Sequence, residues 1–297
     1  MAVSALVVNY QVYEDLQGCL CALEAFLSDD DEVLVVDNAS DPRQLAVIAA
    51  AHPRVRFLPQ HDNIGFSAGV NLAAGIAKNP FLLLLNPDAL MRDPVPRVLE
   101  QWLKDHPDTG VVGPRVLNSD GSVQASARRF PGLSTALGGR STWLTGRFPN
   151  NWMTRRNLLG RTATEPMDAD WVAGSCLMTT RSAFVRAGGL DEGFFLYFED
   201  ADYCKRLARL QLKCTYLPHV TVRHAGGHSA QLVPALAIRA FHRSAVRMTL
   251  KHGGILAALF SPMTWLAMRI RGEWCVWRAP RTRRRETVTE SAKSESS

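Results

Sequence analysis

Cysteine and long hydrophobic runs are both scarce in this sequence. The six cysteines among 297 residues include no Cys-x-x-Cys pair, which excludes a small disulfide-stabilised domain and argues against a zinc ribbon. No window holds the ~18 consecutive apolar residues that a transmembrane helix needs. The first residues also lack the charged start and long apolar stretch of a signal peptide. We therefore expect a cytoplasmic protein with reduced thiols.

Acidic residues are nearly missing from one part of the chain. Residues 239–285 hold eleven Lys or Arg against the single acid Glu273, a net charge of +10. The first 238 residues carry −2, so the formal charge of +6 comes from the C-terminal segment. Because the larger part of the chain is slightly acidic, the basic character does not indicate nucleic-acid binding, and we expect no nucleic-acid partner.

Short apolar runs alternate with segments of helical spacing in the first 85 residues. We expect strands at Val3–Val8, Glu32–Val36, Val55–Leu58 and Phe81–Leu85. Helices are expected between them at Leu16–Leu27, Gln44–Ala50 and Ala68–Ala77. With 46% hydrophobic residues to form a core, this order predicts an α/β fold whose mostly parallel central sheet is flanked by helices.

The pattern is less regular after residue 110. We expect strands at Val111–Val116, Asp170–Thr179, Cys214–Leu217 and Val220–His224, with a helix at Asp200–Leu212. Between the first two of these strands, residues 119–163 are rich in Arg, Gly, Ser, Thr and Pro and are expected to form a long irregular excursion.

Polar residues follow each of the first strands directly, where ligands of parallel sheets bind. They are Asn9 and Tyr10, Asp37 and Asn38, the segment 63–69, and Asn86-Pro87-Asp88. The glycine-containing segment 63–69 opens a helix, whose free N–H groups favour an anion such as a diphosphate. Simpler structural interpretations remain open, because Asp37 suits a turn cap and Asn-Pro-Asp suits a β-turn.

Six motifs in a fixed order carry a resemblance to a known family. They are LVVNY at 6–10, VVDNAS at 35–40, NIGFSAGVN at 63–71, LLLNPDA at 83–89, AGGLDEGFFLYFEDADYCKR at 187–206 and VRHAGG at 222–227. Together they resemble glycosyltransferase family 2, and more narrowly its bacterial rhamnosyltransferase-type members. The resemblance implies a GT-A fold, a nucleotide-diphosphate-sugar donor, a divalent metal (Mg²⁺ or Mn²⁺) and inversion at the anomeric carbon.

The resemblance also implies where the donor nucleotide binds. Asp37 resembles the carboxylate that accepts a hydrogen bond from the pyrimidine base. The other residues implied for the nucleotide and its diphosphate are Asn9, Tyr10, Asn38, Asn63, Gly65, Gly69, Asn71 and Asn86.

For the metal, Asn86-Pro87-Asp88 stands where the broader family has Asp-x-Asp, so that Asp88 remains as the carboxylate ligand. Oxygen ligands suit Mg²⁺ or Mn²⁺. His224 resembles the late histidine that joins the metal, with His228 as a competitor. Without the resemblance, a lone histidine is more often a surface or core residue.

Inverting transfer needs a general base that takes the proton of the acceptor hydroxyl. The resemblance places it in the Glu199-Asp200 pair, and we assign it to Asp200 with Glu199 as its rival. The alternative is that these acids only stabilise a helix N-terminus, by ~0.3–1 kcal/mol each. Trp171, Gly174 and Asp191 are expected near the sugar and the acceptor, although packing explains Trp171 nearly as well.

The basic C-terminal segment alternates apolar stretches with Arg and Lys. Ile255–Met268 is too short to span a bilayer but suits interfacial helices, with Trp265, Trp274 and Trp277 beside it. A helical hairpin packed on the catalytic domain or on a dimer partner is the alternative. We therefore divide the chain into a catalytic domain at 1–234, a basic amphipathic membrane-associating appendage at 235–285, and a disordered tail at 286–297.

These expectations combine into one function. The protein would transfer L-rhamnose from dTDP-rhamnose to a polyprenyl-diphosphate-linked or polysaccharide acceptor in cell-envelope glycan synthesis, at the inner face of the plasma membrane. Another hexose (galactose, glucose or N-acetylglucosamine) from a UDP-sugar is the first alternative. A noncatalytic membrane-surface protein is the second, and homodimerisation stays open. A nucleotidyltransferase is disfavoured, because residues 9–15 contain no Lys or Arg.

Overall fold

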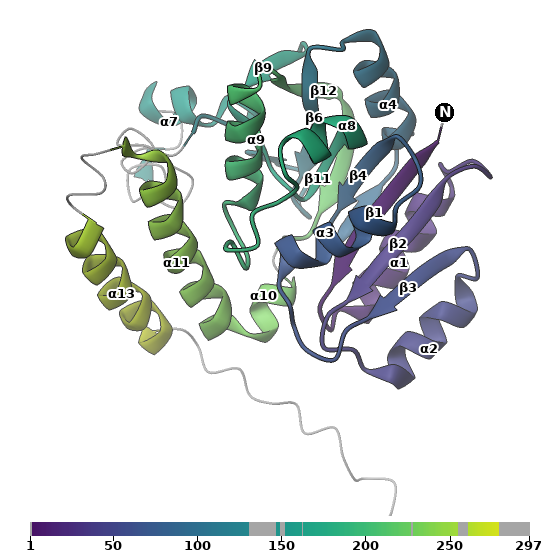
Figure 1. Cartoon of the computed structure of the whole chain (residues 1–297), viewed down its shortest axis with the longest axis horizontal. Helices are drawn as coiled ribbons and strands as arrows, with labels where there is room; N and C mark the ends of the chain where they lie inside the picture. The colour runs from purple at the N-terminus through teal and green to yellow at the C-terminus, as the bar shows by residue number, and fades with distance from the viewer. Residues whose placement is uncertain are drawn as a thin grey trace, which may run out of the picture.

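The computed structural model describes residues 2–130, 147–148, 152–161, 163–226, 228–254 and 261–278. A ten-stranded sheet runs through the molecule, with the strand order β3-β2-β1-β4-β11-β6-β12-β5 along its main path. Helices cover both faces of this sheet (Figure 1). The predicted α/β architecture is therefore confirmed.

The first half of the sheet is parallel, as the sequence pattern predicts. Its strands are β1 (Val3–Asn9), β2 (Glu32–Asp37), β3 (Val55–Pro59) and β4 (Phe81–Leu85). The connecting helices are α1 (Tyr13–Glu24), α2 (Pro42–Ala51) and α3 (Phe66–Ile76). Since Asn9 pairs with Asp37 at the carboxyl ends of β1 and β2, two predicted site residues lie side by side.

The second half of the sheet is mixed. Its strands are β5 (Ala89–Met91), β6 (Thr109–Leu117), β7 (Val123–Gln124), β9 (Met167–Ala169), β11 (Cys176–Thr180) and β12 (Lys213–His224). Strand β11 runs antiparallel to both β4 and β6, whereas β12 is parallel to β6 and antiparallel to β5. Helices α4 (Val95–Asp105), α8 (Arg181–Arg186) and α9 (Glu199–Arg209) complete this half.

Two strand predictions are wrong in detail. The expected strand Asp170–Thr179 is interrupted at residues 173–175, so that β10 (Trp171–Val172) pairs with β8 (Ala127–Arg128) in a separate small sheet. The two strands expected at 214–224 form the single strand β12, whose pairing with β6 shifts register between Leu217 and Thr221. An apolar run cannot reveal either feature, because both depend on the neighbouring strand.

Alternation along β1 divides the core between the two faces of the sheet. Val3, Ala5 and Val7 face a cluster that includes the buried side of α1 and α4, while Leu6 and Val8 face one that includes α3 and α9. All five are buried, and burying a Val or Leu side chain contributes about 1.5–3 kcal/mol. This core fixes the strand ends from which the polar site residues project.

In the described part of the C-terminal region, α10 (His228–Leu232) leads into α11 (Pro234–His252) and α13 (Ser261–Arg278) of the appendage. Helix α13 lies beside α11 (Figure 1), and Arg239 of α11 pairs with Glu273 of α13 at 2.8 Å. Pro262 stands in the first turn of α13, a position that favours a helix start rather than an interruption.

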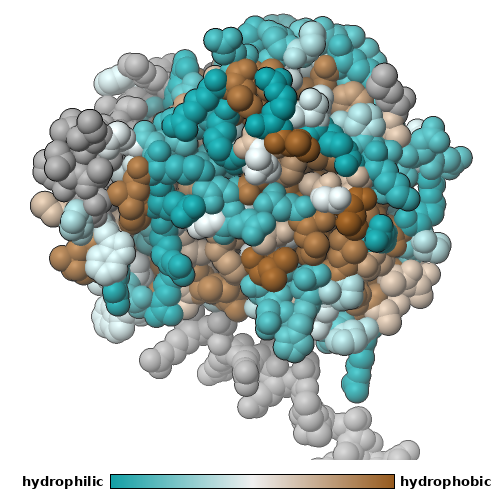
Figure 2. Space-filling model, in the orientation of Figure 1, coloured by the Kyte–Doolittle hydropathy of each residue, from teal (hydrophilic) through white to brown (hydrophobic). Residues whose placement is uncertain are grey.

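Large apolar side chains lie exposed on α13. At the left edge of Figure 2, where α13 lies in Figure 1, hydrophobic and hydrophilic residues occur side by side. The exposed apolar residues are Met263, Trp265, Leu266, Ile270, Trp274 and Trp277. Within the described ranges, no helix combines the length and apolarity needed to cross a bilayer.

Several sequence predictions lie outside the described residues. They concern the disordered tail at 286–297, residues 255–260 of the expected interfacial helices, and residues 131–146, 149–151 and 162 of the excursion expected at 119–163. The described parts of that excursion are not wholly irregular, because they contain β7, β8, α7 (Trp152–Asn157) and η1 (Leu159–Arg161).

Candidate active site

The carboxyl ends of β1 and β2 form the donor edge, which we define as Asn9, Tyr13, Asp37 and Asn38. The Nδ2 of Asn9 donates to Asp37 Oδ1 at 2.7 Å, and the Tyr13 hydroxyl donates to Asp37 Oδ2 at 3.0 Å. Burial and the nearby Asp37 carboxylate raise the pKa of Tyr13 to about 12, so the hydroxyl remains a donor. The Asp37 side chain is fully buried, and both of its oxygens are engaged within the protein.

The donor edge continues into the turn that opens α3. Asn38 donates from Nδ2 to Gly65 O at 3.2 Å, and Asn63 Oδ1 accepts from Gly65 N at 3.0 Å. Gly65 has φ +87°, and a Cβ there would lie 2.7 Å from the Phe195 ring and carbonyl. Glycine is therefore required at position 65 both for the turn and for the approach of residue 195.

The resemblance also implies donor binding by Gly69, Asn71 and Tyr10, whose surroundings differ from those of the donor edge. A Cβ at Gly69 would lie 2.9 Å from Val8, so this glycine lets α3 pack closely on β1. Asn71 uses its amide on the backbone of Leu190 and on Glu192. Tyr10 is half-buried at the end of β1. Their contact with a donor stays a prediction.

Asp88 and His224 meet where β5 pairs with the end of β12. The Asp88 Oδ1 lies 3.1 Å from His224 Nε2, and Asn86 Nδ2 lies 3.1 Å from the same nitrogen. Asp88 Oδ2 accepts from Gly226 N at 3.0 Å. Burial tends to raise the pKa of Asp88, but hydrogen bonding and charge from His224 outweigh it and lower the pKa. The structure thus brings together the two residues predicted as metal ligands.

Gln124 of β7 determines which nitrogen of His224 carries the proton. The His224 Nδ1 lies 3.1 Å from Gln124 Oε1, and an amide oxygen can only accept a hydrogen bond. The Gln124 amide is oriented in turn, since its Nε2 donates to Asn118 Oδ1 at 3.0 Å. In the neutral tautomer with its proton on Nδ1, the imidazole presents a lone pair on Nε2 toward Asp88 Oδ1.

Two acceptor atoms 3.1 Å apart need a proton or a cation between them, so this pair fits a divalent metal. The described ranges contain no cluster of three or more His, Cys, Asp or Glu side chains that could hold a metal. Two protein ligands still suit Mg²⁺, which is usually held by one or two carboxylates together with substrate phosphates and water. The donor set therefore fits a cation that arrives with a diphosphate.

Glu199 and Asp200 are the first two residues of α9, which begins next to the turn at 173–175. Asp200 Oδ2 accepts from Gly174 N at 2.9 Å, and its Oδ1 accepts from Ala201 N at 2.7 Å. Burial raises the pKa of Asp200, while these N–H groups and Arg128 oppose it. Glu199 is buried, its Oε2 has no hydrogen-bond partner among the described residues, and burial followed by the Asp200 charge raises its pKa well above the usual range.

The turn at residues 173–175 joins the Asp88–His224 pair to the expected base. Asn86 N donates to Ser175 O at 3.0 Å, next to the Gly174 N–H that binds Asp200. The donor edge reaches the same place, because Phe66 N donates to Phe195 O at 2.8 Å and a Cβ at Gly174 would lie 3.9 Å from the Phe66 ring. Loops far apart in the sequence thus meet at one rim of the sheet.

Trp171 and Asp191, which were expected near the sugar and acceptor, make protein contacts. The Trp171 indole donates to Arg129 O at 2.9 Å, and the Arg128 guanidinium lies 4.8 Å from its ring. Asp191 accepts from Arg247 and Lys251 of α11 at 2.8 and 2.6 Å. Their contact with substrate stays a prediction, whereas Gly174 lies directly beside Asp200.

Sequence reasoning missed Tyr13, Gln124 and Arg128. Tyr13 stands in the first turn of α1, and Gln124 and Arg128 lie in the segment interpreted as an irregular excursion. No periodicity marks these positions. Their partners are 24, 100 and 43 residues away in the sequence for Tyr13–Asp37, Gln124–His224 and Arg128–Trp171.

Comparison with solved structures defines the class of fold. The chain matches GalNAc-T7, crystallised with UDP, GalNAc and Mn²⁺, with a TM-score of 0.57 and 17% identity over 75% of this chain and 44% of that one. It matches the mannosyltransferase PcManGT from Pyrobaculum calidifontis, in complex with GDP-Man and Mn²⁺, with a TM-score of 0.54 and 17% identity over 94% and 76%. The fold is therefore the GT-A fold of nucleotide-sugar transferases.

Sequence comparison then gives the family. The family described as glycosyl transferase family 2 matches residues 4–163, and the chain belongs to this family. It is 31% identical to the N-acetylglucosaminyl-diphospho-decaprenol L-rhamnosyltransferase of Mycobacterium tuberculosis, over 87% of this chain and 86% of the relative. It is 27% identical to a low-salt glycan biosynthesis hexosyltransferase of Haloferax volcanii, over 69% and 61%. The chain is thus a glycosyltransferase, as the motifs predict.

Proposed function

We propose that this protein is an inverting rhamnosyltransferase that transfers L-rhamnose from dTDP-rhamnose to a polyprenyl-diphosphate-linked or polysaccharide acceptor. The observation that carries the proposal is the meeting of Asp88 and His224 with Asp200 through the turn at 173–175. The activity of the mycobacterial relative supports rhamnose and a decaprenyl-linked acceptor. The archaeal hexosyltransferase relative keeps another hexose from a UDP-sugar as the second candidate.

Asp88 and His224 would hold Mg²⁺ or Mn²⁺, and the bound cation would neutralise the negative charge of the leaving diphosphate. Asn86 lies within 3.1 Å of His224 and is placed to bind a metal-bound water or the sugar. The Mn²⁺ in the two structural neighbours is in keeping with this assignment. In our account the donor edge binds the nucleotide.

Asp200 would take the proton of the acceptor hydroxyl as that oxygen attacks the anomeric carbon. A carboxylate whose pKa is raised toward the working pH is a better base than an ordinary aspartate. Glu199, whose pKa burial and the Asp200 charge raise well above the usual range, would remain protonated beside it and avoid a second negative charge. The N–H groups of Gly174 and Ala201, which hold the Asp200 carboxylate in place, favour Asp200 over Glu199 as the base.

We further propose that α13 places the enzyme at the cytoplasmic surface of the plasma membrane. Its exposed apolar residues lie among arginines, with Arg269 5.0 Å from the Trp265 ring and Arg278 4.4 Å from the Trp274 ring. Tryptophan favours the membrane interface, and basic residues near an anionic surface contribute about 1 kcal/mol each. Packing on a second copy of the chain is the alternative.

A panel of nucleotide sugars tests the donor assignment. The protein is incubated with dTDP-rhamnose, UDP-galactose, UDP-glucose and UDP-N-acetylglucosamine, each with Mg²⁺ or Mn²⁺ and a polyprenyl-diphosphate-linked N-acetylglucosamine. We expect metal-dependent product formation from dTDP-rhamnose. Transfer from a UDP-hexose alone would favour the second candidate, and transfer unaffected by chelation would contradict the metal assignment.

Vesicle sedimentation tests the membrane assignment. We expect the wild type to sediment with vesicles containing anionic lipid, and the double variant I270E/W277E to remain in the supernatant. The matched control is V47E, since Val47 is an equally exposed apolar residue (68%) on α2, away from the appendage. If I270E/W277E binds like the wild type, or if it only converts a dimer to a monomer on a sizing column, the membrane assignment is wrong.

A further inference from the structure

Two consecutive residues in the left-handed region stand directly before the expected base. Tyr197 has φ +70° and Phe198 has φ +69°, and neither is glycine. The left-handed conformation is unfavourable for residues that carry a Cβ. Such strain persists only where the surroundings impose it, and it is concentrated at functional sites. Because Phe198 is the N-cap residue of α9, this turn sets the direction from which Glu199 and Asp200 project.

Helix α11 packs directly against this turn. The Phe241 ring of α11 lies 5.8 Å from the Tyr197 ring, edge to face, and 5.4 Å from the Phe198 ring. One turn further along α11, Ser244 donates from Oγ to Leu196 O at 2.9 Å, and Ser244 is buried. The two strained residues and the residue before them are therefore all held by one face of one helix.

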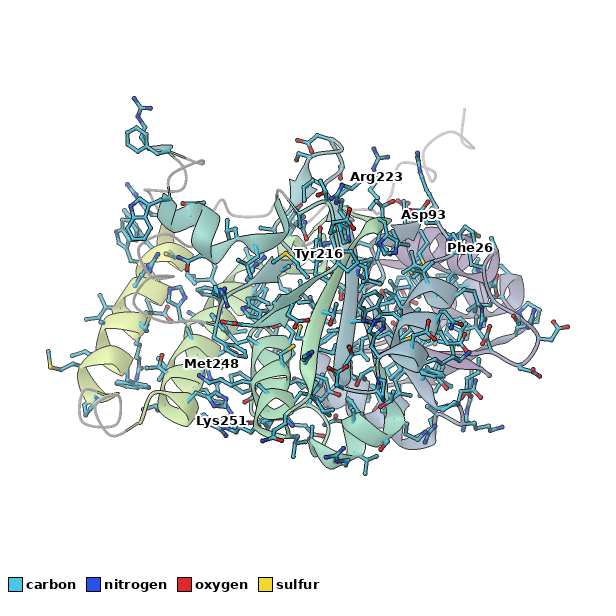
Figure 3. The ribbon with its side chains drawn as sticks, turned by 90° about the horizontal axis from the view of Figure 1, so that it is seen from above. Phe26, Asp93, Tyr216, Arg223, Met248 and Lys251 are labelled. Carbon is cyan, nitrogen blue, oxygen red and sulfur yellow. The ribbon has the colours of Figure 1, made fainter. Side chains whose placement is uncertain are left out.

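Ion pairs fasten both ends of the same segment, residues 191–202, which we call the base segment. At its start, Asp191 binds Arg247 and Lys251. At its end, the fully buried Asp202 binds Lys251 at 2.7 Å and His252 at 2.8 Å. Figure 3 labels Lys251 and the buried Met248 on α11, and both contribute to its contact with the catalytic domain.

We propose that α11 is part of the catalytic apparatus, with Phe241 and Ser244 as positioning residues that hold the Tyr197–Phe198 turn so that Asp200 stays on the Gly174 N–H. The inference rests on the proposed role of Asp200 as the base. The appendage would then have two roles. Its first long helix, α11, would determine the position of Asp200 in the reaction, in addition to the role of the appendage in locating the enzyme. Phe241 and Ser244 need not touch substrate for this.

Three variants of α11 test the proposal. F241A removes the ring that contacts both strained residues, and S244A removes one hydroxyl. T249A is the matched control, since the Thr249 hydroxyl bonds only to the carbonyl of Ala245 in its own helix, at 2.9 Å. For each variant we measure kcat, KM for donor and acceptor, and the affinity for dTDP with Mg²⁺ by titration calorimetry.

We expect kcat to fall at least tenfold in F241A and about threefold in S244A, with dTDP affinity within twofold of wild type and T249A unchanged. F241Y, which keeps the ring, is expected to restore most of the activity. The pH profile gives a readout that general instability would not move. Burial raises the pKa of Asp200, so entry of water would lower this pKa and shift the acidic limb of the kcat–pH profile to lower pH. Glu199 and Arg128, the titratable and charged groups that interact with Asp200, would remain in place.

Several results would overturn the proposal. They are kcat unchanged in both F241A and S244A, a loss in T249A as large as in S244A, or a loss of activity with an unmoved acidic limb. Should F241A fail to fold, the single-hydroxyl variant S244A still decides the question. D200N separates this inference from the proposed function, because full activity in D200N would refute the base itself, whereas an inactive D200N with normal F241A and S244A would refute only the role of α11.

Discussion

Asp37 at the donor edge and Glu199 in the base segment are buried in opposite surroundings. At the donor edge, Asp37 is fully buried and each carboxylate oxygen has a donor from a side chain. In the base segment, Glu199 is also buried, but one of its oxygens lacks a partner within the described part of the chain and its pKa is raised. The Asp37 carboxyl group is thus fully hydrogen-bonded, whereas burial disfavours the ionised form of Glu199.

In our account this difference reflects two roles. Asp37 helps to hold the shape of the donor edge before a ligand arrives, although Asn9 Oδ1 is buried there without a hydrogen-bond partner among the described residues. Glu199 would carry a proton beside the proposed base Asp200 and so avoid a second negative charge. Residues other than glycine adopt a positive φ in both regions, since Gln11 and Ala39 lie close in the chain to donor-edge residues while Tyr197 and Phe198 lie in the base segment.

The largest expected effect is on the base segment. D200N should lower transfer about 10²–10⁴-fold, because the amide cannot accept the acceptor proton, while binding of dTDP with Mg²⁺ stays within twofold. The measurement is initial-rate kinetics together with calorimetry. D105N, at an exposed position of α4, serves as the control. Equal loss of transfer and of nucleotide affinity would show that Asp200 belongs to binding rather than to catalysis.

On the donor edge, D37N should act on stability. The amide loses the charge-assisted hydrogen bonds from Asn9 and Tyr13, and its NH₂ group faces one of these donors. We expect the free energy of unfolding in urea to fall by about 1.5–3 kcal/mol.

The control for D37N is D29N, because the Asp29 side chain is fully exposed and its substitution should change stability by less than about 0.5 kcal/mol. A stable D37N that has lost nucleotide affinity would contradict the view of Asp37 as a structural anchor. It would support the prediction that Asp37 recognises the pyrimidine base of the donor nucleotide.

A smaller effect is expected from Q124L, which removes the acceptor that fixes the tautomer of His224. Partners behind metal ligands typically account for a 10–100-fold change in metal affinity. We expect Mn²⁺ affinity, measured by calorimetry in the presence of dTDP, to fall within that range. Q101L, at an exposed position of α4, is the control. Unchanged Mn²⁺ affinity in Q124L would mean that His224 is not a ligand or that its orientation is fixed by other groups.

The smallest expected effect concerns pH and the start of the base segment. Burial alone would raise the pKa of Asp191, but hydrogen bonds from Lys251 and Arg247 outweigh it and hold the pKa well below its usual range. A lowered folded-state pKa stabilises the protein above the unfolded-state pKa of about 3.9, and this stability is lost as pH falls through the folded-state value.

The stability difference between wild type and D191N should therefore be constant above about pH 5 and shrink as the solution is acidified further. Urea unfolding at a series of pH values measures it. A difference that grows on acidification would show that the ion pairs with α11 do not stabilise the folded protein.

The sequence predicted those features that depend on local pattern. The parallel half of the sheet followed from its apolar runs, and Asp88, Glu199, Asp200 and His224 followed from motif order. The interruption at residues 173–175, the orientation of His224 by Gln124 and the contact of Phe241 with residues 197–198 did not. Each depends on a partner at least 26 residues away, and an apolar run or a basic segment has the same pattern whichever neighbour it meets.

The predicted domain boundary at residue 234 likewise shows what sequence composition cannot predict. The basic composition of residues 239–285 suggests a single membrane-associating unit, yet α11 contacts the base segment while α13 exposes its apolar side chains. Charge composition alone does not distinguish a helix that faces acidic groups of its own protein from one that faces another surface.

The central claim is that a cation held by Asp88 and His224 faces Asp200 within one site. A crystal structure with Mn²⁺ and dTDP, with the metal located by its anomalous scattering, tests this most directly. We predict a metal peak between Asp88 Oδ1 and His224 Nε2, with the terminal phosphate directed toward the Asp200 carboxylate. A metal bound elsewhere, or a diphosphate directed away from Asp200, would contradict the account.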